Sequence, residues 1–335
     1  MPSLYTSTRG KVTVRTATHI VEYRYCLSQA VLARVVLDRI STVAEGLLPE
    51  SQCSFRRNRI TIDMTFASRQ IQEKCREQNQ NLFLIFVDLS KAFDSVNREG
   101  LWQILSRVGV LSKLISIIRS LHDGMRTTVL DHGGESDAFA VQNGTKQGCV
   151  LAPIFFSIFI ACMIYDAFKE LDTGIRVNCQ SDGGVLNLRQ LQAKTKVSCM
   201  LVRELMFADD CALAAHNEED AQMLMDAFAY SAEWCGLTIS LKKMEVLAKP
   251  KPGVSSITPN ILMSQTALKT CENFPYLGSI LSNDYSIDAE IHVHTAKAAA
   301  AFGRLARRLW NTRYQSVYQG CSLLCSDTHS IVIWL

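Results

Sequence analysis

The sequence is poor in the residues that are typical of unfolded or fibrous chains. Only 7 of its 335 residues are proline and 17 are glycine, whereas 48% are hydrophobic. A chain of this composition has ample apolar material to bury, which excludes a disordered or fibrous protein. At roughly 100–200 residues per domain, the length predicts two or three packed units or one large body with several lobes.

Two further absences bear on the cellular compartment. The 12 cysteines include no CxxC pair, and the first 20 residues contain no apolar run of the signal-peptide type. This pattern indicates free thiols in a reducing, intracellular location, cytoplasm or nucleus, without structural zinc. The uncharged run 147–165 only just reaches the roughly 17–25 residues that span a bilayer, and it contains Pro153. We therefore expect a buried helix there and no membrane contact.

The net charge is also small, at +3, but it is unevenly distributed. Residues 1–80 carry 12 basic and 7 acidic side chains, residues 81–290 carry 18 and 24, and residues 291–335 carry 5 and 1. An acidic middle between basic ends fits a metal centre flanked by phosphate-binding surfaces. Chance alone would fit the same distribution equally well.

The spacing of apolar residues predicts a chain of mixed helices and strands. Helices are expected at 30–40, 62–75, 101–108, 111–121, after Pro153, at 218–235 and at 287–310. Strands are expected at 82–87, 126–130, 137–142, 205–207, 211–215, 237–248, near 268 and at 276–280, and the polar stretch 172–196 is expected to be an insertion or hairpin.

Three carboxylates are the strongest chemical signal. Asp88 directly follows the apolar run LFLIFV, and Asp209 and Asp210 lie between two short apolar runs that predict a hairpin. Carboxylates gathered at strand ends repel one another unless a cation is present, and two Mg²⁺ ions bridged by substrate phosphates would relieve that repulsion. An ordinary exposed turn with two acids is the alternative interpretation.

The acids belong to a longer series of motifs that resembles the reverse transcriptases of non-LTR (LINE-type, RTE-like) retrotransposons. The resemblance runs in order from about residue 48 to residue 310. Its blocks are LPESQCSFRRNR (48–59), FVDLSKAFDSVNR (86–98), NGTKQGCVLAP (143–153), LMFADD (205–210), GLTISLKKMEVL (236–247) and FPYLGS (274–279). Ser54 stands where the family has a glycine.

The resemblance implies an α+β right-hand polymerase fold with fingers, palm and an incomplete thumb. The palm would be an antiparallel sheet backed by helices. The expected boundaries are fingers at 1–85, a palm with further fingers portions and the primer grip at 86–284, and the start of a thumb at 285–335. We expect the tail from about residue 312 to be the product of a frameshift, because it does not resemble a thumb.

The resemblance also implies roles for individual residues. Asp88, Asp209 and Asp210 would be catalytic metal ligands, with the backbone of Leu89 as a supplementary ligand, and Lys243 would protonate the leaving pyrophosphate or else be a solvated lysine. The remaining assignments are nucleotide binding by Arg56, Arg57, Phe93, Gln147 and Gly148, with Phe93 as the gate against a ribose 2′-hydroxyl, and a primer grip at Phe274, Tyr276, Leu277 and Gly278.

The implied activity is RNA-directed DNA polymerisation by two-metal nucleotidyl transfer. Its cofactor would be Mg²⁺, with Mn²⁺ as an alternative, and its partners would be an RNA template, a DNA or RNA primer and dNTPs. The alternative is an inactive retroelement remnant that at most binds nucleic acid.

Overall fold

The fold is described for residues 5–6, 11–15, 20–24, 27–131, 134–145, 149–180, 197–254 and 257–309 of a computed structural model. The chain divides into two compact units, with the boundary between Thr270 and Cys271. The expected frameshifted tail lies outside the described residues.

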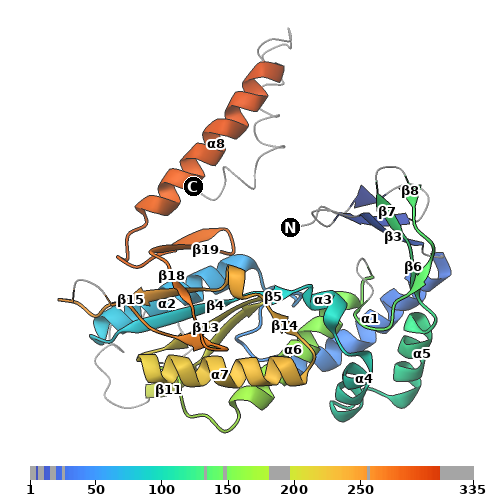
Figure 1. The fold of residues 1–335 in the computed structure, drawn as a ribbon, viewed down its shortest axis with the longest axis horizontal. Helices are drawn as coiled ribbons and strands as arrows, with labels where there is room; N and C mark the ends of the chain where they lie inside the picture. Colours follow the sequence, from blue (N-terminus) through green and yellow to red (C-terminus); the bar gives the residue numbers. More distant parts are fainter. Residues whose placement is uncertain are drawn as a thin grey trace. The chain divides into compact units, whose positions relative to one another are not determined.

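Groups of strands and groups of helices follow one another along the chain (Figure 1). The helices are α1 (Leu27–Leu47), α2 (Thr61–Glu77), α3 (Ala92–Ser95), α4 (Arg98–Arg107), α5 (Ser112–His122), α6 (Ala152–Phe168), α7 (Glu218–Trp234), the 3-10 turn η2 (Leu241–Lys243) and α8 (Asp288–Leu309). The strands of the first unit are β1 (Tyr5–Thr6), β2 (Lys11–Arg15), β3 (Ile20–Arg24), β4 (Leu82–Val87), β5 (Leu89–Ser90), β6 (Arg126–Thr127), β7 (Val129–Asp131), β8 (Gly134–Glu135), β9 (Phe139–Ala140), β10 (Ile175–Gln180), β11 (Val197–Val202), β12 (Glu204–Phe207), β13 (Asp210–Ala215), β14 (Thr238–Ile239), β15 (Glu245–Lys249), β16 (Leu262–Met263), β17 (Thr266–Ala267) and β18 (Lys269–Thr270).

The central sheet has the strand order β12-β13-β4-β15-β18. Its pairs are antiparallel except for β15 and β18, which run parallel. All six residues of β4 are buried, as expected of a strand with neighbours on both edges and a continuous apolar sequence. The expected strand at 82–87 is therefore confirmed as the middle of the sheet.

Helices α6 and α7 lie together on one side of this sheet (Figure 1). Most residues of α6 are buried, including Phe155, Phe156 and Phe159. This burial explains the uncharged run as a core helix that begins beside Pro153. In the described parts of the chain, no helix combines the length and apolarity that a membrane span needs.

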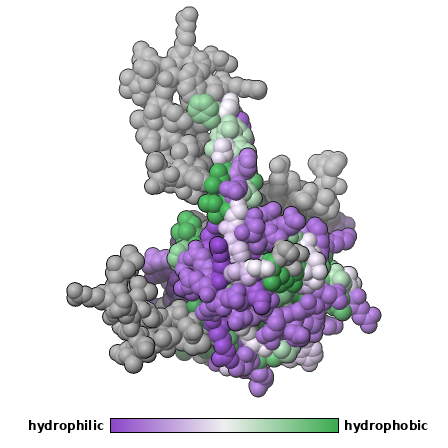
Figure 2. Space-filling model, turned by 90° about the vertical axis from the view of Figure 1, so that its left-hand side faces the viewer, coloured by the Kyte–Doolittle hydropathy of each residue, from purple (hydrophilic) through white to green (hydrophobic). Residues whose placement is uncertain are grey.

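One face of the molecule is mostly polar. On the face drawn in Figure 2, hydrophilic residues predominate and apolar residues form small separate clusters. A second sheet, β1-β2-β3-β7-β8, joins residues near the N-terminus to the strands around residue 130. Sequence periodicity gave no indication of its N-terminal strands.

Three expected strands are wrong in detail. The segment 237–248 is not one strand, because β14 pairs with β5 whereas β15 pairs with β4, and η2 lies between them. The segment 276–280 is interrupted by a turn, because Leu277 and Gly278 both have positive φ angles, 49° and 90°. Apolar alternation continues through both breaks, so it could not reveal them. The segment 126–130 is also divided, because β6 pairs with β9 whereas β7 pairs with β3 and β8 in another sheet. Of the polar stretch 172–196, residues 175–180 form β10, which pairs antiparallel with β11, and residues 181–196 lie outside the described residues.

The second unit contains a hairpin and a helix. Strand β19 (Asn273–Tyr276) pairs with β20 (Ser279–Ser282) across a two-residue turn. Positive φ at both central residues is the geometry of a type I′ turn, which matches the twist of the strands that it joins. Helix α8 follows and contacts β20.

Candidate active site

The three predicted acids meet where two neighbouring strands of the central sheet end. Asp88 directly follows β4, and β13 pairs antiparallel to β4 with Cys211 opposite Val87. Extending that register by one residue brings Asp210 opposite Asp88. Asp209 lies in the two-residue turn between β12 and β13, because Phe207 pairs with Asp210.

The hairpin turn is under backbone strain. Ala208 has a φ of 59°, a left-handed value that normally favours glycine. The Ala208 side chain is nevertheless buried. Pairing of β12 with β13, and of β13 with β4, fixes both ends of the turn, so tertiary structure maintains a conformation that the local sequence disfavours.

The acids influence one another's protonation. Burial is the main cause that raises the pKa of Asp209 above its ordinary value, and the Asp88 carboxylate adds to the increase while Lys243 opposes it. Burial, then repulsion from Asp209 and Asp88, raises the pKa of Asp210 to about 6, although this side chain still reaches solvent. Mutual repulsion of this kind favours either a bound proton or a bound cation.

Lys243 supplies a positive charge at this group of acids. Its Nζ atom lies 3.1 Å from Oδ2 of Asp88 and donates a hydrogen bond of 3.3 Å to Oδ1. Lys243 closes the 3-10 turn η2, and this turn is held against the end of β4 by the 2.9 Å hydrogen bond from the Ser240 amide to the Asp88 carbonyl. The break in the expected strand 237–248 therefore brings the lysine to the acid.

The donor set suits a hard cation such as Mg²⁺, because it consists of carboxylate oxygens. Oδ2 of Asp88 is buried and accepts no hydrogen bond of good geometry, although it lies in an ion pair with Lys243. Within the described residues, however, no three Asp, Glu, His or Cys side chains are gathered closely enough to hold a metal as they stand. The residues fit such an ion in chemistry, and ligation would require their carboxylates to draw together.

The loop with the predicted arginines is attached to the same hairpin. Gln52 forms a parallel bridge with Met206 of β12, and backbone hydrogen bonds of 2.8 and 3.1 Å join Met206 to Ser51 and Cys53. Ser54, at the position of the family glycine, is buried and bonds the Gln52 side chain through both its amide and its hydroxyl. The loop therefore accommodates the serine side chain.

The two candidate arginines have different surroundings. The Arg56 side chain is only 5% exposed, pairs with Glu45 at 3.0 Å and donates to the carbonyls of Pro49 and Gln52. Arg57 is exposed, and no described residue engages its guanidinium. The structure thus uses Arg56 to hold the loop together and leaves Arg57 available to a ligand.

Phe93 projects from the short helix α3, five residues after Asp88. Its ring centroid lies 4.5 Å from that of Phe156 in the core helix α6. Leu89 is buried in β5, opposite Ile239 of β14. Gln147 and Gly148 lie outside the described residues. Leu89 and Phe93 thus both belong to the short segment that directly follows Asp88.

The four residues of the expected primer grip lie in one hairpin of the second unit. Phe274 and Tyr276 belong to β19, and Leu277 and Gly278 form the turn. The boundary between the units falls at 270/271, just before this hairpin.

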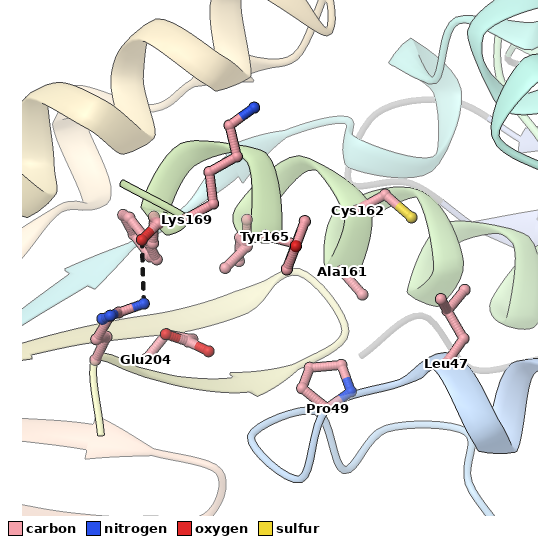
Figure 3. Close-up of a pocket in the computed structure, with 10 residues that line it drawn as sticks. Leu47, Pro49, Ala161, Cys162, Tyr165, Lys169 and Glu204 are labelled. Atoms are coloured by element: carbon pink, nitrogen blue, oxygen red, sulfur yellow. Dashed lines mark hydrogen bonds between the residues drawn. The ribbon is translucent and has the colours of Figure 1, made fainter. Parts of the chain in front are cut away.

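A cavity of about 500 Å³ was not anticipated from the sequence. Figure 3 shows Leu47 and Pro49 on one side of it and α6 residues such as Tyr165 on the other, with Glu204 of β12 at its edge. Burial raises the pKa of Glu204, and a 2.9 Å hydrogen bond from Ser51 opposes this increase. No sequence motif includes Glu204. The only signal in the sequence is its position at the start of the strand that leads into the hairpin turn.

Comparison with known families decides the identity of this arrangement. Residues 21–281, more than half of the chain, match the family model described as reverse transcriptase (RNA-dependent DNA polymerase). The chain belongs to the reverse transcriptase family. The match includes both strands of the acidic hairpin and the strand that ends at Asp88, and with the helix-backed sheet it confirms the expected α+β right-hand polymerase class.

The relatives of this reverse transcriptase chain are polymerases of non-LTR retrotransposons. It is 22% identical over 198 residues to the Pol polyprotein from the Drosophila melanogaster type-2 element R2DM, covering 59% of this chain and 16% of that protein. It is 30% identical over 135 residues to the RNA-directed DNA polymerase of the Drosophila funebris mobile element jockey, covering 39% and 14%. The chain thus spans about a sixth of the length of these relatives. A telomerase from Candida tropicalis superimposes with a TM-score of 0.47 at 15% identity, covering 77% of this chain and 44% of that one.

The family assignment confirms the expected membership of the non-LTR reverse transcriptases, whose enzymes generally use divalent metal ions. The finer assignment to the RTE branch stays a prediction. So do the individual residue roles and the domain boundaries.

Proposed function

We propose that this chain performs RNA-directed DNA synthesis, extending a DNA or RNA primer on an RNA template with dNTPs and releasing pyrophosphate. The observation that carries the proposal is the convergence of Asp88 with Asp209 and Asp210 at adjacent strand ends, in a chain of the reverse transcriptase family. The raised pKa values of the two hairpin acids support it, because such a group gains most from a bound cation.

Asp88, Asp209, Asp210 and the backbone carbonyl of Leu89 would hold two Mg²⁺ ions, or Mn²⁺ in their place. Once bound, these ions would activate the primer 3′-hydroxyl and neutralise charge on the α-phosphate and on the leaving pyrophosphate. The ion pair between Lys243 and Asp88 supports a role of this lysine as proton donor to the pyrophosphate, since its Nζ lies at the acids themselves.

The remaining assignments concern the nucleotide and the primer. Arg57 is the better candidate for the triphosphate, because its guanidinium is exposed and not engaged by the described residues, and its fork suits phosphate oxygens. The Phe93 ring would exclude a ribose 2′-hydroxyl. Gln147 and Gly148 would contact the nucleotide or template, and the hairpin of Phe274, Tyr276, Leu277 and Gly278 would hold the primer end.

Primer extension on a homopolymer RNA template tests the proposal. We expect incorporation of dNTPs that falls below about a thousandth of the unmodified rate in Asp88→Ala and Asp209→Ala. Asp123→Ala is the matched control, because this exposed aspartate follows α5 and belongs to no predicted site.

Two outcomes would contradict the proposal. If Asp88→Ala extended primers as fast as the unmodified chain, a contaminating polymerase in the preparation would be responsible for the extension. Absence of extension at every Mg²⁺ concentration, with salt-sensitive RNA binding retained, would favour an inactive nucleic-acid-binding remnant.

A further inference from the structure

Arg98 holds together four backbone carbonyls that are far from it in sequence. Its Nε donates to Gly144 at 2.8 Å, and its Nη atoms donate to Val141 at 2.9 Å, His122 at 3.2 Å and Asn143 at 3.3 Å. Arg98 is the first residue of α4, where the helix dipole disfavours a positive charge. Hydrogen bonds to three carbonyls of the 141–145 loop offset this cost. We therefore infer that the main role of Arg98 is to hold this loop in place.

The loop that Arg98 binds is in turn joined to α3. The Gly144 amide donates to the Val96 carbonyl at 2.8 Å, and Thr145 donates to the Phe93 carbonyl through its amide at 2.8 Å and its hydroxyl at 3.3 Å. A Cβ added at Gly144 would lie 2.6–2.8 Å from backbone atoms of Asp94. The loop and α3 are therefore in direct backbone contact, closer than any side chain would permit.

Helix α3 needs this external support. It has only four residues, its preceding residue Lys91 is in a left-handed conformation with φ 50°, and no side chain caps its start. A helix of one turn has too few internal hydrogen bonds to be stable by itself. The position of Phe93 therefore depends on Phe156, against which its ring packs, and on the loop that Arg98 fixes.

We propose that Arg98 is a positioning residue for nucleotide selection. By fixing the 141–145 loop on α3, it sets the position of the Phe93 ring and with it the discrimination between deoxyribose and ribose. The inference rests on the proposed function, specifically on Phe93 as a wall of the nucleotide site. A guanidinium suits this task, because its rigid fork of N–H donors lets one side chain satisfy several carbonyls in a fixed geometry.

The variant that tests the inference is Arg98→Lys, which keeps the charge and loses the fork. The matched control is Arg119→Lys in α5. The Arg119 guanidinium forms an exposed ion pair of 2.8 Å with Glu99, which follows Arg98 in α4. Primer extension is measured with a dNTP and with the matching rNTP, and Phe93→Ala serves as the reference for lost discrimination.

We expect the dNTP-to-rNTP ratio of kcat/KM to fall at least about tenfold in Arg98→Lys, because a small displacement of a positioning group changes rates by one to two orders of magnitude. Arg119→Lys keeps the ratio within about twofold, as expected of a surface pair. The inference would be overturned if the dNTP-to-rNTP ratio were unchanged in Arg98→Lys but fell strongly in Phe93→Ala. A ratio unchanged in Phe93→Ala as well would instead refute the role of Phe93.

A second measurement does not depend on activity. Amide hydrogen exchange of residues 141–145 should accelerate in Arg98→Lys and stay unchanged in Arg119→Lys, because the loop opens when its carbonyls lose the arginine. Unchanged exchange in Arg98→Lys overturns the inference whether or not the chain extends primers. If Arg98→Lys does not fold, Thr145→Val replaces it, since it removes only the hydroxyl bond to Phe93 and should shift both readouts in the same direction.

Discussion

The Nζ atom of Lys243 lies 3.1 Å from Oδ2 of Asp88, so an ammonium group neutralises the carboxylate at the end of the central strand. The lysine side chain is 68% exposed and that of Asp88 is 29% exposed. A divalent ion that binds Asp88 must therefore compete with this ammonium or displace it. The pair links two properties that are usually measured separately, affinity for the metal and rate of the chemical step.

Lys243→Met is expected to change these two properties in opposite directions. Removing the competing charge should lower the Mg²⁺ concentration at half-maximal rate severalfold, whereas losing the proton donor should reduce the maximal rate by about 10²-fold. Extension rates measured across a Mg²⁺ titration give both quantities. Lys242→Met, at the exposed neighbour in the same 3-10 turn, should change neither. A Lys243→Met variant that needs more Mg²⁺ would show that the lysine supports the metal site rather than competes with it.

Substitutions of the two arginines in the loop that precedes α2 should separate an effect on stability from an effect on nucleotide binding. Arg56→Ala removes an ion pair with Glu45 and two bonds to carbonyls, so the free energy of unfolding should fall by about 2 kcal/mol. Arg57→Ala should change it by less than about 0.5 kcal/mol, yet raise the KM for dNTP about tenfold.

Urea denaturation and steady-state extension of both variants provide the comparison. Each arginine is the control for the other, because they are neighbours in the same loop. A raised KM in Arg56→Ala at unchanged stability would reverse the assignment.

Gly144→Ala and Gly109→Ala form a matched pair for the contact between the loop and α3. Both glycines have positive φ angles, 83° and 88°, so an alanine is strained at either position. Only at Gly144 would the new Cβ meet backbone atoms within 2.8 Å, whereas nothing lies within 4 Å at Gly109. Gly109→Ala should therefore lower the free energy of unfolding by about 1 kcal/mol, and Gly144→Ala by about 3 kcal/mol or more. Equal losses in urea denaturation would mean that the loop moves freely away from Asp94.

Glu204 should make stability depend on pH. Burial raises its pKa above 4.5, so the folded state binds this proton more tightly than the unfolded state does. Its contribution to stability is fully present below about pH 4.5 and is lost as pH rises through the folded pKa. Glu204→Gln removes the charge and keeps an oxygen that can accept from Ser51. The variant should therefore exceed the unmodified chain in stability at pH 8 and match it near pH 4.

Denaturation at both pH values measures this effect. Glu233→Gln in α7, at an exposed position, should show no such dependence. A stability difference between Glu204→Gln and the unmodified chain that is the same at pH 4 and pH 8 would refute the role of burial at this carboxylate.

Much of the site follows from local sequence. A continuous apolar run followed by Asp88, and two short runs around Asp209 and Asp210, determine a buried strand and a hairpin with acids at their ends. Local patterns suffice there, because apolar periodicity reports which faces of a segment are buried. They also sufficed for α6, because the uncharged run up to Tyr165 indicated a core helix.

Tertiary structure alone decided the partners of these segments. Arg98 bonds Gly144, 46 residues away, and Lys243 meets Asp88 across 155 residues. No periodicity contains that information, because hydrogen-bond partners distant in sequence are chosen by packing and strand order. The same reason explains why the sequence left Arg56 and Arg57 equivalent, whereas the structure buries one and exposes the other.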